Sequence, residues 1–275
     1  MLDEQIHRAS IVVAHPDDEI LWFSSVVERA KAVLVCFMEL PENATVSVGR
    51  ESLARHFPLQ NTEFLGITES VTFQGADWRD PVETPYGLEV RRRKGILPGF
   101  DAARYRANFH TLVELLTDRL QGAETVLTHN PWGEYGHEDH VQVYRAVSKV
   151  RETLGFDLWY SNYCSERAFP LMRRHIRGLR GESEQFETNL DLARSIEALY
   201  REHQCWTWPF DDYPFFDRER FIVDAPRASR RQVGSMIPLN FIEVDGPAQD
   251  RASATARIRR AARRARSALT PVRTS

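Results

Sequence analysis

The segment SIVVAHPDDE, from Ser10 to Glu19, joins an apolar run directly to an imidazole and three carboxylates. Short runs rich in β-branched residues are typical of a strand buried on both faces. A helical stretch from about Glu19 to Lys31 and a second apolar run, Ala32–Phe37, come next. This order of strand, helix and strand predicts a βαβ unit with parallel strands.

Alternation of strand and helix continues to about residue 165. Residues 41–48 are expected to form a loop and 49–57 a short helix. Further strands are expected at 71–73, 125–128 and 156–160, further helices at 101–120, 139–151 and 190–203, and a surface loop at 80–99. The pattern predicts an α/β, Rossmann-like fold with a mostly parallel sheet, helices on both faces and a smaller C-terminal extension. We expect one domain over residues 1–250, with its motifs in 9–165, and a basic Ala/Arg-rich tail over 251–275.

Composition narrows the class of protein. The 275 residues carry a net charge of -3, which predicts no nucleic-acid partner for the body of the chain. The three cysteines are scattered, so neither a disulfide framework nor a cysteine zinc site is expected. The N-terminus lacks a signal-peptide pattern, and no apolar run reaches the roughly 20 residues of a membrane span. We therefore expect a soluble, cytoplasmic protein, and the sequence leaves its oligomeric state open.

A second polar segment, NPWGEYGHEDH from Asn130 to His140, follows the strand expected at 125–128. Ligands of doubly wound sheets bind where parallel strands end, so both polar segments are expected at one edge. His137 and His140 are three residues apart, which places them on neighbouring positions of a helix. Imidazole and carboxylate are good zinc ligands, and three of them with one open position are typical of a catalytic site. A turn with a helix cap would explain either segment alone, but it explains the pair poorly.

The two motifs, AHPDDE followed by NPxGxYGHxDH, resemble those of the LmbE-like (PIG-L) deacetylases. That family includes the N-acetylglucosaminyl-phosphatidylinositol de-N-acetylases and the mycothiol-pathway deacetylase. The resemblance covers residues 9–150 well and implies that His15, Asp18 and His140 bind Zn2+, with Fe2+ as the alternative ion. It also implies a hydrolase that removes an N-acetyl group from an N-acetylglucosamine-type aminosugar conjugate, a small-molecule substrate.

The resemblance also implies the roles of the residues around the metal. Asp17 matches the general base that activates water, and a cationic His137 would stabilise the oxyanion, assisted by Tyr135. Asp139 would orient a histidine from outside the ligand set. Positions that bind substrate are matched by Asp77 and by either Arg50 or Arg55.

The sequence departs from the family pattern at two places. After AHPDDE the family usually has small residues, often two glycines, whereas this chain has the bulky Trp22 and Phe23 before Ser24 and Ser25. This difference affects the substrate pocket more than the metal site. Glu138 stands between the last two histidines, where proline is frequent, and is expected to have little effect.

Three other interpretations stay open. The chain could be an amidase that cleaves a larger acyl or thiol-conjugate amide, or a non-catalytic carbohydrate-binding protein that retains metal. Asp17 beside Asp18 argues against a pure binder, which needs no base. A protein held to acidic lipid or nucleic acid by the tail at 257–266 is less favoured than a solvated tail. The aromatic stretch 206–216 is expected to be mostly packing, with one or two rings lining the pocket.

Overall fold

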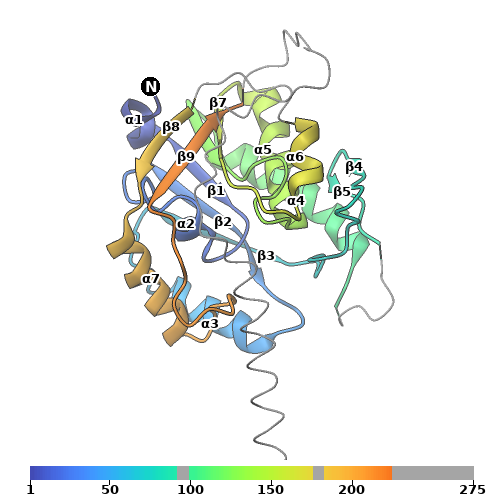
Figure 1. Cartoon of the computed structure of the whole chain (residues 1–275), viewed down its shortest axis with the longest axis horizontal. Coiled ribbons are helices and arrows are strands. Elements are labelled where there is room, and N and C mark those ends of the chain that lie inside the picture. The colour runs from blue at the N-terminus through green and yellow to red at the C-terminus, as the bar shows by residue number, and fades with distance from the viewer. Residues whose placement is uncertain (92–98, 176–182, 225–275) are drawn as a thin grey trace, which may run out of the picture. The chain divides into compact units, whose positions relative to one another are not determined.

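The computed structural model describes residues 1–91, 99–175 and 183–224. At its centre is a seven-stranded sheet with the strand order β3-β2-β1-β6-β7-β9-β8 (Figure 1). Five strands are parallel: β1 (Ser10–Val13), β2 (Ala32–Glu39), β3 (Thr62–Thr68), β6 (Thr125–Thr128) and β7 (Asp157–Ser161). Two antiparallel strands, β9 (Arg218–Val223) and β8 (Ser183–Glu187), extend the sheet beyond β7. The α/β fold with a mostly parallel sheet is confirmed.

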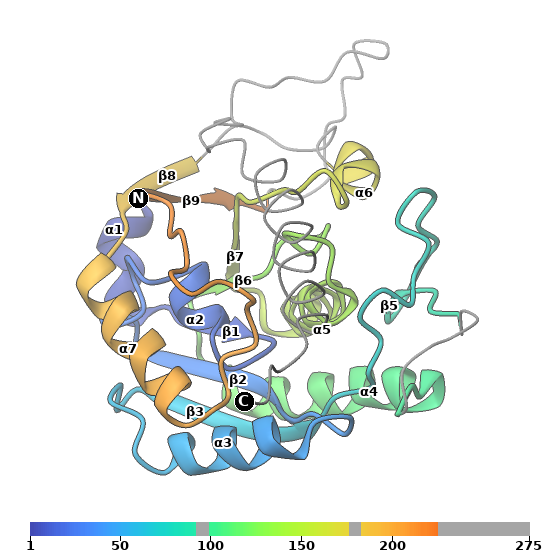
Figure 2. The same cartoon turned by 60° about the horizontal axis from the view of Figure 1, so that its bottom comes forward.

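Helices pack on the sheet in two groups (Figure 2). The first group contains α2 (Asp18–Leu21), α3 (Ala44–Ala54) and α7 (Leu190–Glu202), and α7 contacts both of the others. In the second group, α4 (Ala102–Arg119) packs on α5 (Glu138–Leu154), which also contacts β1, β6 and β7. The smaller elements are α1 (Leu2–Gln5), η1 (Ile6–Arg8), the hairpin of β4 (Glu83–Thr84) and β5 (Gly87–Leu88), and α6 (Phe169–His175).

Strand β1 lies at the centre of the core, and all four of its residues are buried. Successive side chains of a strand point to opposite faces. Ile11 and Val13 therefore share one face, where they belong to the same apolar cluster as Leu53 of α3 and Tyr200 of α7. Because both faces of the strand are covered, its sequence is a continuous apolar run.

The strand order places the site. Strand β1 has β2 on one side and β6 on the other, and the chain reaches these neighbours by different crossovers. Such a point, where the order of strands reverses, opens a crevice at the carboxyl ends of the strands. Both polar motifs begin there, because AHPDDE follows β1 and the Asn130–His140 segment follows β6.

Several local expectations were wrong. The helix expected to reach Lys31 ends at Leu21, because Ser24 and Ser25 donate to the side chain of Glu219 instead of continuing it. Residues 71–73 form no strand, and Val71 has a φ of 52°. Helix α3 begins at Ala44, inside the stretch expected to be a loop. The expected surface loop at 80–99 contains the short β4–β5 hairpin.

The expected domain boundary at residue 250 and the basic tail at 251–275 lie outside the described residues. Of the expected surface loop at 80–99, the structure describes residues 80–91 and 99, and Arg91 pairs there with Glu89 at 2.9 Å. Among the described residues, every helix is too short or too polar to cross a membrane.

Candidate metal centre and active site

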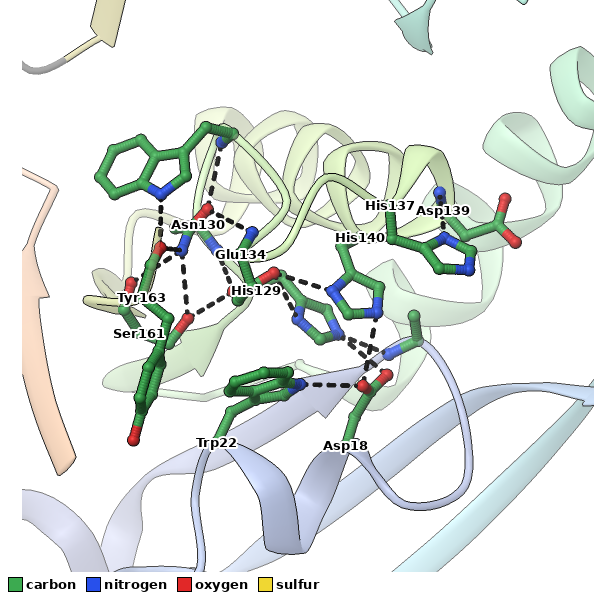
Figure 3. A network of polar contacts seen from close by, with 12 residues as sticks. Asp18, Trp22, His129, Asn130, Glu134, His137, Asp139, His140, Ser161 and Tyr163 are labelled. Atoms are coloured by element: carbon green, nitrogen blue, oxygen red, sulfur yellow. Dashed lines mark hydrogen bonds and ion pairs between the residues drawn. The ribbon is translucent and has the colours of Figure 1, made fainter. Parts of the chain in front are cut away.

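Donor atoms for a metal gather where β1 and β6 end (Figure 3). His15 and Asp18 follow β1, His129 follows β6 directly, and His137 and His140 come from the start of α5. Three overlapping groups of buried side chains have their donor atoms within 4.8 Å of one another: His15, His137 and His140; Asp18, His129 and His140; and His15, Glu69 and Asp139.

The Asp18 carboxylate is the centre of this cluster. Its Oδ2 atom accepts a hydrogen bond from the backbone N–H of His15 at 2.7 Å, and its Oδ1 atom accepts one from the indole of Trp22 at 2.9 Å. Burial alone would raise the pKa of Asp18, but His140 and His129 hold it well below its usual range. The group is therefore an anion in the core, which requires cationic or hydrogen-bonding partners.

The ring nitrogens of His140 have different surroundings. Nδ1 lies 2.8 Å from Oε2 of Glu134 and donates to it, so the neutral ring carries a lone pair on Nε2. That Nε2 atom is buried and makes no hydrogen bond, although Oδ1 of Asp18 is 3.3 Å away. Either a proton on Nε2 or a metal cation between Nε2 and Oδ1 makes this contact favourable.

His15 lies on the other side of the Asp18 carboxylate, close enough to share a metal ion with it. Its Nδ1 atom lies 3.3 Å from Oδ2 of Asp18, the same separation as between Asp18 and His140. Tetrahedral zinc with bonds of about 2.0–2.1 Å separates its ligand atoms by about 3.3–3.4 Å. The structure thus brings the three residues that the resemblance implied to one place, with His15 next to Oδ2 and His140 next to Oδ1 of the same carboxylate.

The second ring nitrogens of His15 and His140 each contact a buried carboxylate, from Asp139 and Glu134 respectively. Nε2 of His15 lies 3.3 Å from Oδ2 of Asp139, whose other oxygen accepts the hydroxyl of Thr72 at 3.0 Å. Glu134 supports His140 in the same way and also accepts the backbone N–H of Asn130 at 2.9 Å. Such pairs set the tautomer and orientation of histidine ligands. Asp139 was expected in this role, whereas Glu134 was not singled out.

His129 was also missed by the sequence reasoning. Its ring stacks on that of His140 with centroids 3.8 Å apart. Nε2 accepts the backbone N–H of Ala14 at 2.8 Å and lies 3.4 Å from Oδ2 of Asp18. Nδ1 is buried without a hydrogen bond, 3.2 Å from Oε2 of Glu134. Because Nε2 already accepts the N–H of Ala14, we interpret His129 as a support for His140 and not as a ligand. Its position directly after β6 was the available signal.

Asp17 lies beside the proposed ligand Asp18 in a strained backbone conformation. Its φ is 109°, in the left-handed region that favours glycine, and its backbone N–H donates to Oε2 of Glu19 at 3.0 Å. Strained residues of this kind cluster at functional sites. Burial and then the charge of Asp18 raise the pKa of Asp17 well above its usual value. A carboxylate with a raised pKa is suited to accept a proton near neutral pH.

His137 caps α5 and is only 8% exposed. Its Nδ1 atom accepts the backbone N–H of Asp139 at 3.1 Å, so the proton of the ring lies on Nε2. Burial and then the neighbouring His15 and His140 lower the pKa of His137 well below its usual value. These contacts favour a neutral imidazole that donates from Nε2, in contrast to the cation expected from the sequence.

Tyr135 stands next to these histidines, with its ring centroid 5.8 Å from that of His137 and 5.2 Å from that of His140. Burial and then the charge of Asp18 raise the pKa of Tyr135 well above its usual value. The phenol therefore keeps its proton and can donate a hydrogen bond.

The expected substrate-binding residues are placed differently from one another. Arg50 is buried and pairs through Nη1 with Oε1 of Glu69 at 2.5 Å, and Oε2 of Glu69 lies 3.9 Å from Nε2 of His15. Arg55 ends α3 and is exposed. Asp77 is exposed, and its side chain accepts the backbone N–H of Arg79 at 3.1 Å. Of the two arginines, the structure brings Arg50 next to the site.

Glu138 has a larger role than the sequence suggested. Its buried carboxylate accepts hydrogen bonds from the backbone N–H groups of Gln74 and Ala76, at 3.1 and 2.8 Å, and from the indole of Trp78 at 2.9 Å. The expectation of little effect was wrong, because Glu138 fastens this loop to α5. On the same loop, Phe73 stacks on His137 with centroids 4.8 Å apart.

No family model and no curated protein sequence matches the chain. Solved structures that align with it include a deacetylase of teicoplanin biosynthesis in complex with teicoplanin, at 12% identity and a TM-score of 0.45, covering 78% of this chain and 97% of that one. A triple mutant of the teicoplanin-pathway deacetylase aligns at 13% identity and a TM-score of 0.46, covering 81% and 100%. The A40926 pseudoaglycone deacetylase Dbv21 aligns at 18% identity and a TM-score of 0.40, covering 72% and 81%.

Proposed function

We propose that this protein is a metal-dependent hydrolase that removes an N-acetyl group from an N-acetylglucosamine-type aminosugar conjugate. One observation carries the proposal: the buried Nε2 atom of His140 makes no hydrogen bond and faces the Asp18 carboxylate at 3.3 Å, with Asp17 next in sequence. A cation between His140 and Asp18 resolves this contact, and a spare carboxylate beside the ion is what a hydrolase needs and a binding protein does not.

His15, Asp18 and His140 are the proposed ligands. When bound, zinc lowers the pKa of water to about 7 and polarises a carbonyl. Asp139 and Glu134 hold the two imidazoles so that one nitrogen of each faces Asp18.

Asp17 is the proposed general base. In its ionised form it accepts a proton from the attacking water and then delivers that proton to the leaving amine, so that the amide C–N bond breaks and acetate is released. Its left-handed backbone is held by the hydrogen bond to Glu19, and Thr207 donates to its Oδ2 atom at 3.3 Å. Both contacts fix where the carboxylate points.

His137 and Tyr135 are the proposed donors to the oxyanion. Nε2 of His137 carries the proton, because Nδ1 is already an acceptor, and the phenol of Tyr135 stays protonated. Two neutral donors stabilise the developing negative charge without bringing a second cation close to the ion.

The test is acetate release by zinc-loaded protein from a panel of N-acetylhexosamine conjugates, repeated with larger acyl amides and with Fe2+. We expect Asp17→Asn to lower kcat by about 10²–10⁴-fold, the usual contribution of a general base, while zinc binding is retained. Asp191→Asn, in the first turn of α7, is the control.

Each alternative gives its own result. Hydrolysis of larger acyl amides without acetate release would replace the deacetylase with an amidase of that class. Bound zinc without hydrolysis of any amide would point to a carbohydrate-binding protein instead.

A further inference from the structure

We propose that Trp22 is a positioning residue for the Asp18 carboxylate, and that strand β9 holds it in place through Glu219. This inference rests on the proposed metal site and adds a part that lies outside both sequence motifs. It concerns the position where the resembling family has small residues.

The first step is the contact between Trp22 and Asp18. The indole Nε1 atom of Trp22 donates to Oδ1 of Asp18 at 2.9 Å, and both side chains are buried (Figure 3). The backbone N–H of His15 donates to the other oxygen at 2.7 Å. With one donor on each oxygen, the carboxylate cannot rotate without losing a hydrogen bond. Its remaining lone pairs face the rings of His15, His129 and His140.

The second step is the packing of the indole. Its ring centroid lies 4.8 Å from that of Tyr163, 6.0 Å from that of Tyr135 and 6.3 Å from that of Trp208. Contacts with aromatic rings from three separate segments leave the indole little room to turn.

The third step lies in the backbone that follows. Ser24 donates to Oε1 of Glu219 through its N–H and hydroxyl, at 2.9 and 2.7 Å. Ser25 donates to Oε2 in the same way, at 3.0 and 2.5 Å. Glu219 belongs to β9 and is buried. Each oxygen of its carboxylate accepts two hydrogen bonds from one of the two serines.

Together these contacts explain the short helix α2. Trp22 ends the helix as its C-cap, four residues after Asp18, where helix geometry allows the two side chains to meet. Glu219 then keeps residues 24–25 from extending the helix. Strand β9, which lies next to the edge strand β8, thereby helps to set the orientation of the Asp18 carboxylate. Loss of such supporting hydrogen bonds typically lowers metal affinity by about 10–100-fold.

The test compares Trp22→Phe with Trp208→Phe. Each replaces one tryptophan of the same aromatic cluster, but only Trp22 donates to Asp18. The zinc dissociation constant is measured by competition with a chromogenic chelator, and thermal unfolding of the metal-free proteins checks the fold. We expect a loss of about 10–100-fold for Trp22→Phe and less than about threefold for Trp208→Phe.

A second variant keeps the inference testable if Trp22→Phe does not fold. Glu219→Gln retains the indole but removes acceptors for the two serines, so we expect a smaller loss of zinc affinity. In a double-mutant cycle, Glu219→Gln should add little to Trp22→Phe, because both act through Asp18.

The outcomes separate the two proposals. If the unaltered protein does not bind zinc, the proposed function fails. If it binds zinc and Trp22→Phe binds it equally well, or loses no more than Trp208→Phe, only the role of Trp22 is overturned. If the losses of zinc affinity in Trp22→Phe and Glu219→Gln add up in the double variant, the link between β9 and Asp18 would be overturned.

Discussion

The two sides of the candidate site are built differently. The metal side consists of His15, Asp18, Glu134 and His140, and each carboxylate there is held by at least two different residues. The loop side is the segment 72–78, which carries Phe73 against His137 and is fastened largely by one side chain, Glu138. We infer that substitutions can separate ion binding from substrate recognition, and the following predictions test that separation.

The largest effect is expected on the metal side, from Glu134→Gln. Glu134 is buried and holds His140 while it accepts the N–H of Asn130. Breaking a buried pair by altering one partner costs about 3–5 kcal/mol of unfolding free energy. We also expect zinc affinity to fall by about 10–100-fold. Denaturant unfolding and chelator competition measure the two quantities, and unchanged affinity would remove Glu134 from the metal side.

An intermediate effect is expected on the loop side, from Glu138→Gln. The amide has one acceptor atom where the carboxylate has two, so part of the loop's hydrogen bonding is lost. An unsatisfied buried donor costs about 1–3 kcal/mol, which corresponds to a rise of KM by about 5–150-fold if the loop contacts substrate. Zinc affinity should not change. Glu152→Gln, on the exposed end of the same helix, is the control. A parallel loss of zinc affinity would mean that the two sides are one unit.

The smallest effect is expected from Glu83→Gln, in the β4–β5 hairpin outside both sides. A hydrogen bond with His175, aided by Arg145 and Arg174, lowers the pKa of Glu83 from 4.5 to about 2. Because the folded state lowers this pKa, the stabilisation is complete above pH about 4.5 and is lost as the pH falls toward 2.

Because Glu83 is partly exposed and screened by solvent, we expect Glu83→Gln to lower the free energy of unfolding by about 1 kcal/mol at pH 7. Denaturant unfolding of both proteins between pH 7 and pH 3 measures the difference, which should shrink as the pH falls. A difference that does not depend on pH would contradict the ionic explanation.

The sequence predicted the parallel centre of the fold well and its edges poorly. Strands β1 and β6 are buried on both faces, so each is a continuous apolar run. Strands β3 and β8 lie at the two edges, and most of their residues are only partly buried, so their sequences mix polar and apolar residues. Local periodicity gives no clear signal for such strands.

The candidate site divides in the same way. His15, Asp18 and His140 stand in two contiguous motifs and could be found by reading along the chain. The contacts that support them could not, because Ser24 meets Glu219 across 195 residues and Gln74 meets Glu138 across 64. Pairings over such distances depend on the order of strands in the sheet, which local sequence does not specify.

The backbone of Asp17 has a consequence for the stability of the folded protein. An aspartate with a φ of 109° is held where glycine would rest without strain, at a penalty of roughly 1–3 kcal/mol. Glycine at this position would relieve the strain, so the carboxylate of Asp17 is present at a cost in folding stability that no other side chain of the AHPDDE motif carries.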